Sequence, residues 1–499
     1  MVSALAFDLG ASGGRAVVGQ LESKQAERLT ITEIHRFPND PARVHRRMYW
    51  DILRLFHEVK QGIHQTHLAG YRDLQSMGID TWGVDFGLIG SHGELLGNPY
   101  HYRDDHTLNI MEELWQVVPR EEIFARTGIQ FMPINTIYQL YALKEVASPV
   151  LDKAEALLMI PDLLRYFLTG EQHNEWTNAS TTQLCNPYTR SWDKELIEKL
   201  GLPPHIFLEP VAPGTQVGSL LPSISNELRV PATPVIAVAE HDTGSAVVAV
   251  PAESLDFAYI SCGTWSLIGT EISEPLINEQ SLALNFTNEG GVNNTSRLLK
   301  NVTGLWLIQE CRRVWRNEGK NFSYQEELRL VEQAQPIQSF IDPDHPMFVN
   351  PLHMPRQVQQ YCRETKQQVP ETEGELLRCI VQSLACKYRL VLEQIEQLTQ
   401  KHFPGLHMVG GGIQNTVLCQ YTANALARPV WAGPQESTAI GNLLVQYTAL
   451  SHIEDIQQAR RIVRNSFPIK TYVPQEMETW ERAFEQFCAC TQAYNVRNS

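Results

Sequence analysis

The spacing of apolar and polar residues in the first ninety positions predicts a sheet with one helix packed on it. Three short β-type runs separated by glycine-rich or polar stretches predict a strand meander at 4–10, 15–21 and 29–37. Residues 51–66 place apolar side chains at helical spacing, so we expect a helix that packs back on these strands. Two further strands are predicted at 74–80 and 84–90.

The second half of the chain repeats the opening design. Residues 257–271 form a strand, a turn of small residues and a second strand, as the first residues do. Between the halves, residues 201–234 hold seven prolines, which predicts an extended, semi-rigid connector followed by a buried strand at 233–239. Later elements are predicted as a helix at 373–400, a strand at 406–409 and a helix that begins near Asn415.

Length and charge restrict the class of protein. A chain of 499 residues corresponds to two to four domains, and 43% hydrophobic with 19% charged residues is a globular composition. The formal net charge is −15 and no basic cluster interrupts the acidic background, so we expect no nucleic-acid partner. Any phosphate site must therefore be local, built from backbone N–H groups and a metal ion.

Targeting signals and cysteine use point to the cytoplasm. The N-terminal stretch lacks a basic region and a cleavage site, and no run of about 18 apolar residues occurs, so neither a signal peptide nor a membrane span is expected. Nine cysteines are few and odd in number, which favours reduced thiols, including Cys362 with Cys379 and Cys488 with Cys490. His64 and His67 are three residues apart without further ligands, so no transition-metal site is expected.

The first motif that could take part in binding or catalysis is Asp8-Leu-Gly-Ala-Ser-Gly-Gly-Arg15. Glycines allow backbone N–H groups to approach an anion, but the run that follows alternates like a strand. This argues against a dinucleotide fold or a P-loop, in which a helix would follow, and favours a phosphate-binding hairpin with Asp8 holding Mg²⁺ through water. A plain β-turn stabilised by Asp8 is the alternative.

A second hairpin, Ser261-Cys-Gly-Thr-Trp265, offers the N–H of Gly263 and the hydroxyl of Thr264 to a phosphate. On its own this is also a common β-turn. Together with the first hairpin it predicts a pair of turns that grip a triphosphate from both sides.

The segment Glu240-His-Asp-Thr-Gly244 follows an apolar strand and precedes a small, apolar run. Asp242 could act as a general base at the carboxyl end of a strand, where sites of α/β proteins gather, or simply cap a helix. His241 is either a sugar ligand or a loop residue.

The segment Val409-Gly-Gly-Gly-Ile-Gln-Asn415 places three glycines ahead of a helix. Without Cβ atoms they form a flat surface on which an adenine or ribose can lie; an ordinary strand–helix loop is the alternative.

Taken together, these motifs resemble the FGGY carbohydrate kinases of the actin, sugar-kinase and Hsp70 superfamily, over nearly the whole chain. The segments that carry the resemblance are DLGASGGR (8–15), GIDTWGVDFGLI (78–89), YRD (102–104), GIQF-P-NT-YQL (128–140), WTNASTTQL (176–184), HDT-SAV (241–247), SCGTWSL (261–267), NEGG (288–291), LKN-GLWL-Q (299–309) and VGGG-QN (409–415). The combination is specific, whereas each piece alone is not.

The resemblance implies an α/β protein of two ribonuclease H-like, actin-like ATPase domains around a cleft, each a mixed sheet with flanking helices. An N-terminal domain (1–245) would hold the sugar site, the first hairpin and the catalytic aspartate. A C-terminal domain (246–452) would hold the second hairpin and the adenosine loop, and a C-terminal extension (453–499) has no assigned role. A monomer is expected.

The implied activity is transfer of the ATP γ-phosphoryl group, with Mg²⁺, to a sugar. The match is closest to members that phosphorylate the 1-hydroxyl of L-rhamnulose in L-rhamnose degradation. Kinases for L-fuculose or a pentulose, or a non-catalytic ATP-binding member, are the alternatives.

Residue roles follow from motif positions. Asp242 would accept the proton and Asp8 would hold Mg²⁺, as expected above. The ATP ligands would be Ala11, Ser12, Gly13, Gly14, Arg15, Thr264, Gln309 and Gly411. The sugar ligands would be Gly83, His241, Asp242, Thr243 and Asn301.

Two departures from the family pattern bear on these roles. Ala11 stands where other members usually carry a hydroxyl residue, which removes one side-chain phosphate contact but not the backbone cradle. Gly83 stands where glycerol kinases of the family carry an arginine, and the glycine leaves room for a longer sugar.

Overall fold

The computed structural model of the chain describes residues 1–22, 27–335 and 339–498, and it describes side chains as far as Thr491. These residues form two compact units. Unit 1 comprises Met1–Glu253, Glu271–Leu298 and Ser437–Phe467, and unit 2 comprises Ser254–Thr270, Leu299–Glu436 and Pro468–Ser499, of which Ser499 lies outside the described residues. Neither unit is continuous in sequence, and the boundaries at residues 245 and 452 stay predictions.

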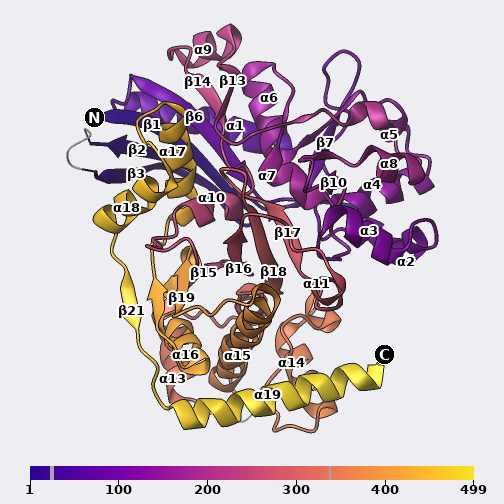
Figure 1. Cartoon of the computed structure of the whole chain (residues 1–499), viewed down its shortest axis with the longest axis vertical. Helices are drawn as coiled ribbons and strands as arrows, with labels where there is room; N and C mark the ends of the chain where they lie inside the picture. Colours follow the sequence, from indigo (N-terminus) through magenta and orange to yellow (C-terminus); the bar gives the residue numbers. More distant parts are fainter. Residues whose placement is uncertain (23–26, 336–338, 499) are drawn as a thin grey trace. The chain divides into compact units, whose positions relative to one another are not determined.

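Unit 1 is built on a six-stranded mixed sheet (Figure 1). Its order is β13 (Thr215–Ser219), β14 (Pro234–Ala237), β6 (Leu74–Thr81), β1 (Val2–Gly10), β2 (Gly13–Leu21) and β3 (Leu29–Pro38). β1, β2 and β3 pair antiparallel, β6 and β14 run parallel to β1, and β13 closes the edge antiparallel to β14. The predicted meander and the strand at 74–80 are confirmed.

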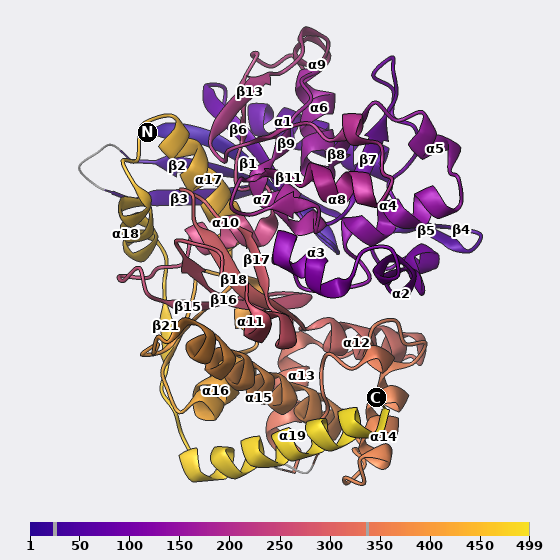
Figure 2. The same ribbon diagram turned by 45° about the vertical axis from the view of Figure 1, so that its right-hand side comes forward.

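Helices cover both faces of this sheet because alternate residues of its strands point to opposite sides. α17 (Ser437–Ala449) lies against one face, where a Cβ on Gly19 of β2 would come within 2.6 Å of Leu443 (Figures 1 and 2). α1 (Ile52–Leu68) lies against the other, where a Cβ on Gly62 would come within 2.6 Å of Phe7. The helix predicted at 51–66 is therefore confirmed, with Asp51 as its N-cap.

The rest of unit 1 consists of short strand pairs and helices. The pairs are β4 (Ala42–Val44) with β5 (Arg47–Tyr49), β7 (Phe86–Ile89) with β8 (Ala156–Met159), β9 (Asn174–Glu175) with β12 (Pro210–Val211), and β10 (Cys185–Asn186) with β11 (Ser191–Trp192). The helices are α2 (Ile110–Trp115), α3 (Arg120–Thr127), α4 (Thr136–Glu145), α5 (Pro149–Asp152), α6 (Ile160–Thr169), α7 (Trp176–Ala179), α8 (Lys194–Lys199), α9 (Pro222–Leu228), α10 (Asp242–Val248), α11 (Glu279–Ala283) and α18 (Ile456–Ser466).

The prediction of an extended connector at 201–234 is wrong. This stretch belongs to unit 1 and contributes β13, an edge strand of the sheet, and α9. Pro222 occupies the first turn of α9, where a missing N–H costs no helix hydrogen bond. Pro210 and Pro234 are the first residues of their strands, so the prolines start elements here instead of excluding them.

Unit 2 contains most of a seven-stranded sheet that repeats the order of the first. The order is β17 (Thr287–Gly290), β18 (Ser296–Thr303), β16 (Trp265–Ile272), β15 (Ala258–Cys262), β19 (Leu406–Val409), β20 (Val430–Ala432) and β21 (Lys470–Tyr472). From β18 to β21 it matches β3, β2, β1, β6, β14 and β13 position by position: a hairpin, two parallel strands and an antiparallel edge. The internal repeat noticed in the sequence is confirmed and extends over six strands.

The helices of unit 2 are α12 (Trp306–Asn317), α13 (Tyr324–Gln333), α14 (Met354–Glu364), α15 (Glu373–Thr399), α16 (Thr416–Leu426) and α19 (Met477–Asn498). α19 runs past α15 and α16 in both views, and its Trp480, Phe484 and Phe487 share a buried cluster with Phe340 and Ala425 (Figures 1 and 2). The segment after residue 452 therefore adds α18 to unit 1 and β21 with α19 to unit 2. No described helix is long and apolar enough to cross a membrane.

Candidate active site

The first glycine-rich motif is a tight hairpin, as predicted. Ala11 and Ser12 form the turn, whereas Gly13 and Arg15 already belong to β2. Asn39 braces the turn, because its side-chain Nδ2 donates to the carbonyl of Gly10 at 2.9 Å. Sequence reasoning did not identify this brace.

Gly14 of this motif is buried and has a packing reason to be glycine. A Cβ at this position would lie 2.4 Å from the ring of Phe37, on the neighbouring strand β3. Its expected contact with ATP stays a prediction, and its missing side chain is explained without a ligand.

Asp8 and Arg15 face each other across the hairpin. They are register partners on β1 and β2, and the Asp8 carboxylate accepts from Nε of Arg15 at 3.0 Å and from Nη2 at 2.6 Å. Both side chains keep a small exposed fraction, 10% for Asp8 and 16% for Arg15. A guanidinium held in place beside the hairpin turn can offset the charge of a phosphate group.

Asp80, which sequence analysis did not select, lies beside Asp8. It is the register partner of Asp8 on β6, is fully buried, and accepts from Nδ2 of Asn442 at 2.6 Å. Its second oxygen, Oδ1, has no hydrogen-bond partner among the described residues. Burial and the Asp8 carboxylate raise the pKa of Asp80 well above its usual value.

Asp242 is the first residue of α10, at the carboxyl end of β14. Its Oδ1 accepts from the backbone N–H of Thr243 at 2.5 Å and from the Thr243 hydroxyl at 3.1 Å. The side chain is 32% exposed. Desolvation raises the pKa of Asp242, against the opposing influence of His241 and of the Thr243 hydrogen bonds. A carboxylate with a raised pKa and an open side is suited to accept a proton.

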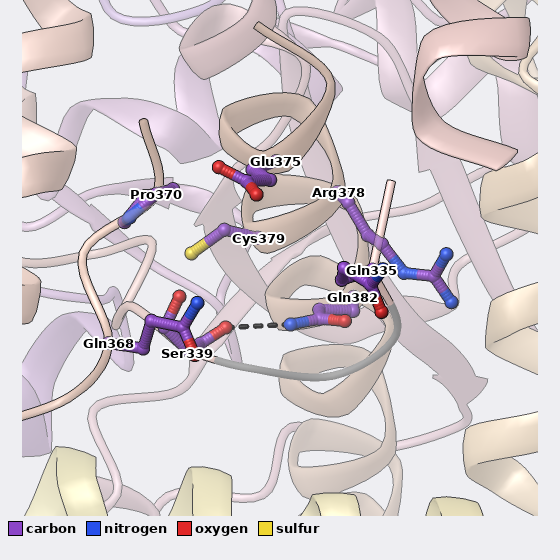
Figure 3. Close-up of a pocket in the computed structure, with 8 residues that line it drawn as sticks. All are labelled: Gln335, Ser339, Gln368, Pro370, Glu375, Arg378, Cys379 and Gln382. Carbon is purple, nitrogen blue, oxygen red and sulfur yellow. Dashed lines mark hydrogen bonds between the residues drawn. The ribbon is translucent and has the colours of Figure 1, made fainter. Parts of the chain in front are cut away.

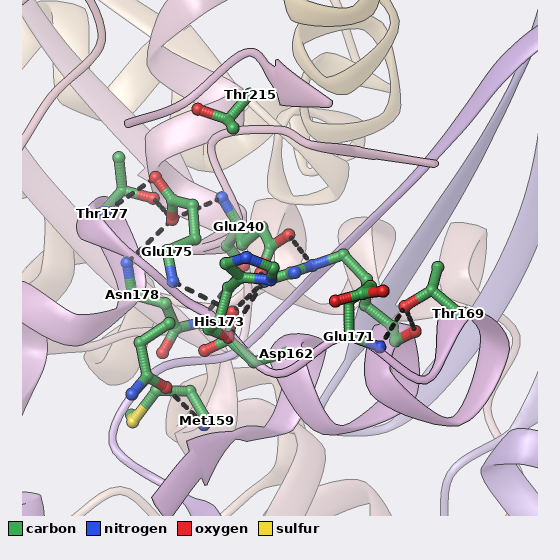
Figure 4. A network of polar contacts seen from close by, with 12 residues as sticks. Met159, Asp162, Thr169, Glu171, His173, Glu175, Thr177, Asn178, Thr215 and Glu240 are labelled. Carbon is green, nitrogen blue, oxygen red and sulfur yellow. Dashed lines mark hydrogen bonds and ion pairs between the residues drawn. The ribbon is translucent and has the colours of Figure 1, made fainter. Parts of the chain in front are cut away.

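The backbone just before Asp242 is held by a buried polar network (Figure 4). Glu240 pairs with the fully buried Arg165, whose Nε donates to Oε1 at 2.9 Å. The N–H of Glu240 donates to Glu175 at 3.1 Å, and its carbonyl accepts from the N–H of Thr81 at 2.9 Å. Burial, together with the Glu240 charge, raises the pKa of Glu175 to about 8. The segment that carries Asp242 is thus fixed at every backbone polar group of Glu240.

His241 is buried between α10 and the start of β18. Its Nδ1 lies 3.1 Å from Nη2 of Arg297 and 3.1 Å from Oε2 of Glu289, and its Nε2 lies 3.5 Å from Oδ1 of Asp242. Glu289 entered the sequence analysis only as part of the NEGG motif (288–291), and Arg297 lies in none of the quoted motifs.

Gly83 precedes a strained turn. Val84 has a φ of 66°, which is rare for a β-branched residue. It is held by the Thr181 hydroxyl, which accepts from its N–H at 3.1 Å, and by the Thr136 hydroxyl, which donates to its carbonyl at 2.6 Å. A Cβ on Gly83 would lie 2.9 Å from that same Thr181 hydroxyl, so this turn requires glycine.

The next residue, Asp85, is the centre of an aromatic cluster. Its fully buried carboxylate accepts from the indole N–H groups of Trp50 at 2.6 Å and Trp82 at 3.0 Å, and from Nε2 of Gln139 at 2.9 Å. Burial raises the pKa of Asp85 to about 7. These hydrogen bonds link the turn at Gly83 to the packed aromatic side chains around Asp85.

In unit 2, the structure brings together two predicted ATP ligands. Gly263 and Thr264 form the turn between β15 and β16, and the Thr264 hydroxyl lies 3.4 Å from the amide of Gln309 on α12. The predicted second hairpin is therefore confirmed. Asn301, the predicted sugar ligand of this unit, lies in β18.

The triple-glycine loop links β19 to α16, and the predicted N-cap at Asn415 is confirmed, since its side chain accepts from the N–H of Leu418. Gly410 has a φ of 89°, and a Cβ on Gly412 would lie 2.3 Å from the sulfur of Cys262. Gly411 is exposed, and a Cβ there would meet nothing within 4 Å. The loop thus presents one open position, flanked by two that only glycine can occupy.

The carboxylates at this end of the sheet in unit 1 are candidates for a metal site. Within the described part of the chain, no group of three or more histidine, cysteine or acidic side chains is arranged to hold an ion. Asp8 with its neighbour Asp80, whose Oδ1 lacks a partner in that part, fits an ion bound mainly by water and phosphate oxygens, as Mg²⁺ usually is.

All nine cysteines are free thiols, as predicted. Cys379 lines a small pocket of unit 2 in which Nε2 of Gln382 donates to the carbonyl of Ser339 at 2.7 Å (Figure 3). The adjacent Cys362 thiol and burial raise the pKa of Cys379 well above its usual value.

Comparison with known proteins decides the family. The model for the N-terminal domain of the FGGY family of carbohydrate kinases matches residues 3–249, and that for the C-terminal domain matches residues 258–450. The chain belongs to the FGGY family of carbohydrate kinases. The expected family, and with it a kinase instead of a non-catalytic ATP-binding protein, is confirmed.

Three relatives that match over nearly their full length are named rhamnulokinase. The chain is 43% identical to a protein named rhamnulokinase from Bacteroides thetaiotaomicron, over 97% of this chain and 98% of that protein. It is 44% identical to rhamnulokinase from Halalkalibacterium halodurans, over 95% and 99%. With rhamnulokinase from Bacillus subtilis it shares 41% identity over 96% and 98%.

Solved structures confirm the expected α/β fold of two mixed-sheet domains. A xylulose kinase from Lactobacillus acidophilus matches with a TM-score of 0.82 at 17% identity, over 99% of this chain and 98% of that one. A glycerol kinase from Plasmodium falciparum matches with a TM-score of 0.74 at 12% identity, over 99% and 98%. At these identities the likeness concerns the fold alone.

Proposed function

We propose that this FGGY kinase transfers the γ-phosphoryl group of ATP to the 1-hydroxyl of L-rhamnulose, giving L-rhamnulose 1-phosphate and ADP. The observation that carries the proposal is the 41–44% identity, over at least 95% of the chain, to three proteins named rhamnulokinase. The reaction would lie in L-rhamnose degradation, before aldol cleavage, and in the cytoplasm. A monomer remains the expected state.

Asp242 is the proposed catalytic base. Its position at the start of α10, its raised pKa and its partly exposed side chain support this role. The carboxylate accepts the proton of the sugar hydroxyl as that oxygen attacks the γ-phosphorus, and the bridging P–O bond to ADP breaks. General-base assistance of this kind contributes about 10²–10⁴ to the rate.

The ATP ligands are proposed from both units. In unit 1 the turn at Ala11 and Ser12, continued by Gly13, Gly14 and Arg15, binds phosphate groups, and the Arg15 guanidinium offsets their charge. In unit 2 the proposed contacts are made by Thr264, Gln309 and Gly411. The 3.4 Å approach of Thr264 to Gln309 and the open position at Gly411 support this assignment.

Mg²⁺ is the proposed cofactor, held by Asp8 through water together with the ATP phosphates. When bound it would neutralise charge on the transferring phosphoryl group. Oδ1 of Asp80, which has no partner in the part of the chain that the structure describes, lies beside Asp8 and supports a cation at this end of β1. Arg15 limits how far the Asp8 carboxylate can turn, which favours a water-mediated contact over a direct one.

The sugar ligands are proposed as Gly83, His241, Asp242, Thr243 and Asn301. Gly83 stands where glycerol kinases of the family carry an arginine, and the missing side chain supports an acceptor longer than glycerol. The brace of Val84 by Thr181 and Thr136 keeps this backbone in place.

A panel of acceptors in a coupled ADP-release assay tests the substrate. L-rhamnulose, L-fuculose, L-ribulose, D-xylulose and glycerol are compared at equal concentration, with ATP alone as the baseline. We expect the highest kcat/KM for L-rhamnulose. A higher value for L-fuculose or a pentulose would assign the chain to a sibling ketose kinase and overturn the proposal.

A further inference from the structure

The two carboxylate oxygens of Asp242 have different surroundings. Oδ1 accepts both hydrogen bonds from Thr243 and lies 3.5 Å from Nε2 of His241. Oδ2 makes no hydrogen bond with the part of the chain that the structure describes. A base needs one free oxygen and a fixed orientation. The contacts of Oδ1 fix the orientation of the carboxylate, and Oδ2 is left free.

The orientation depends on which nitrogen of His241 carries the proton. Nη2 of Arg297 lies 3.1 Å from Nδ1 in hydrogen-bonding geometry. Oε2 of Glu289 lies at the same 3.1 Å from Nδ1, but the contact with hydrogen-bonding geometry is the one to Arg297. A guanidinium can only donate, so in this contact Nδ1 accepts, and the proton of the neutral ring is then on Nε2. This proton faces Oδ1 of Asp242, and a donor in that position favours the ionised carboxylate.

Glu289 balances the charge of the buried Arg297. Its Oε2 lies 3.2 Å from Nη2 of Arg297, and the two side chains are 5% and 1% exposed. Nε of Arg297 donates to the carbonyl of Gly290 at 3.0 Å, which fixes the plane of the guanidinium. An unpaired charge buried to this extent would be strongly destabilising.

We propose that Arg297, with its charge balanced by Glu289, is a positioning residue that holds His241 in the Nε2-protonated form and thereby leaves Oδ2 of Asp242 as the oxygen that accepts the sugar proton. The inference rests on the proposed function, since it assumes that Asp242 is the base. The charged groups around this pair are Arg297 and Glu289 on the His241 side, and Asp8 and Asp80 on the Asp242 side.

Protons and electron pairs balance in a single transfer step. The O–H bond of the sugar hydroxyl breaks and its proton joins Oδ2 of Asp242. The electron pair left on the sugar oxygen forms the new bond to the γ-phosphorus, and the pair of the broken P–O bond leaves with ADP. His241 keeps its own proton throughout, so Arg297 acts through orientation and transfers nothing.

The direct test is the ¹⁵N spectrum of His241 in the whole protein, labelled at histidine and assigned with His241→Gln. We expect a protonated Nε2 and an unprotonated Nδ1 at neutral pH. A protonated Nδ1, in the neutral ring or in an imidazolium, would overturn the proposal.

Variants connect the tautomer to catalysis. In Arg297→Met the donor to Nδ1 is lost, so we expect the ring proton of His241 to shift toward Nδ1, beside Glu289. We also expect kcat to fall at least about tenfold, because part of the general-base contribution is lost. Affinity for ADP should stay unchanged. Arg297→Lys keeps a donor and should recover part of kcat; a rate as low as that of the methionine variant would contradict the proposal.

Two controls separate positioning from folding. Arg460→Met removes another buried arginine of unit 1, paired with Glu271, and should leave the His241 spectrum and kcat near wild type. An equal loss of kcat there would contradict a specific role for Arg297. If Arg297→Met does not fold, the double variant with Glu289→Gln removes both buried charges together, and the same shift of the proton is expected.

Failure of this inference is distinguishable from failure of the proposed function. If Asp242→Asn retains wild-type turnover, the assignment of the base is wrong. If Asp242→Asn is inactive while the wild-type spectrum places the proton on Nδ1, only the role of Arg297 is wrong.

Discussion

Asp8 on β1 and Asp80 on β6 are register partners in a parallel strand pair, so their two carboxylates lie side by side at one end of the sheet. Arg15 balances the charge of Asp8, whereas the buried carboxylate of Asp80 accepts one hydrogen bond among the described residues, from Asn442. Burial and the Asp8 carboxylate raise the pKa of Asp80, so a cation bound beside the pair would favour its ionised form, which supports the proposed Mg²⁺ site.

Asp8→Asn should therefore weaken the use of Mg²⁺. The variant keeps the size of the side chain but loses its charge, so we expect the Mg²⁺ concentration for half-maximal activity to rise about 10–100-fold, as for other residues that hold a metal through an outer-sphere contact. Steady-state rates across a Mg²⁺ titration measure this. Glu33→Gln, an exposed acid on β3, is the matched control, and an Asp8→Asn titration curve that overlays the wild-type curve would rule out the role.

Asp242→Asn should separate binding from chemistry. Asparagine keeps an oxygen for the Thr243 hydrogen bonds but cannot take a proton, so we expect kcat to fall about 10²–10⁴-fold. Calorimetric affinity for an unreactive ATP analogue should stay as in wild type. Asp40→Asn changes an exposed carboxylate and should have no effect on either quantity. Near-normal turnover in Asp242→Asn would remove this residue from the mechanism.

Gly411 and Gly412 form a matched pair for the adenosine loop. A methyl group on Gly411 meets no atom within 4 Å, so Gly411→Ala should leave thermal stability unchanged but raise KM for ATP, because the added methyl occupies the surface proposed for the nucleoside. A methyl group on Gly412 would meet Cys262 at 2.3 Å, so Gly412→Ala should lower stability by about 1–3 kcal/mol, as overpacking does. An unchanged KM in Gly411→Ala would exclude this position from the ATP site.

His101 provides a prediction about pH. It is buried against Trp50, with ring centroids 4.1 Å apart, and burial lowers the pKa of His101 to about 3. Because the unfolded chain binds this proton near pH 6.5 and the folded chain does not, stability is lost as the pH falls below about 6.5.

Between pH 7.5 and 5.5 the loss from this one group should be about 1.4 kcal/mol. His101→Asn keeps an acceptor for the N–H of Arg103 and removes the titration, so its urea midpoint should fall less than that of wild type over the same interval. Equal falls in the two proteins would show that His101 is already protonated or exposed in the folded state.

The sequence predicted those parts of the fold that depend on local pattern. Alternation and glycine placement were enough for the hairpins at 10–13 and 262–265, because a strand that directly follows a short turn has few other partners. The prolines of 201–234 were misinterpreted, since a proline that starts a helix looks the same in sequence as one that prevents it.

The missed site residues depend on contacts between distant segments. Asp80 lies within an apolar strand, between Ile79 and Thr81, and its role became visible only when Asn442, 362 residues away, was found on its carboxylate. Arg297 similarly reaches His241 over a separation of 56 residues. A charged residue inside a run of buried strand residues was the signal that could have identified Asp80.

We propose that this chain phosphorylates L-rhamnulose at its primary 1-hydroxyl, and the product itself can show this. The most direct measurement is the ³¹P NMR spectrum of the product formed from ATP and L-rhamnulose by the purified protein. We predict a new phosphomonoester signal split by the two protons of one CH₂ group, with ADP formed in equal amount. ADP formed without an ester, or an ester split by a single CH proton, would contradict the claim.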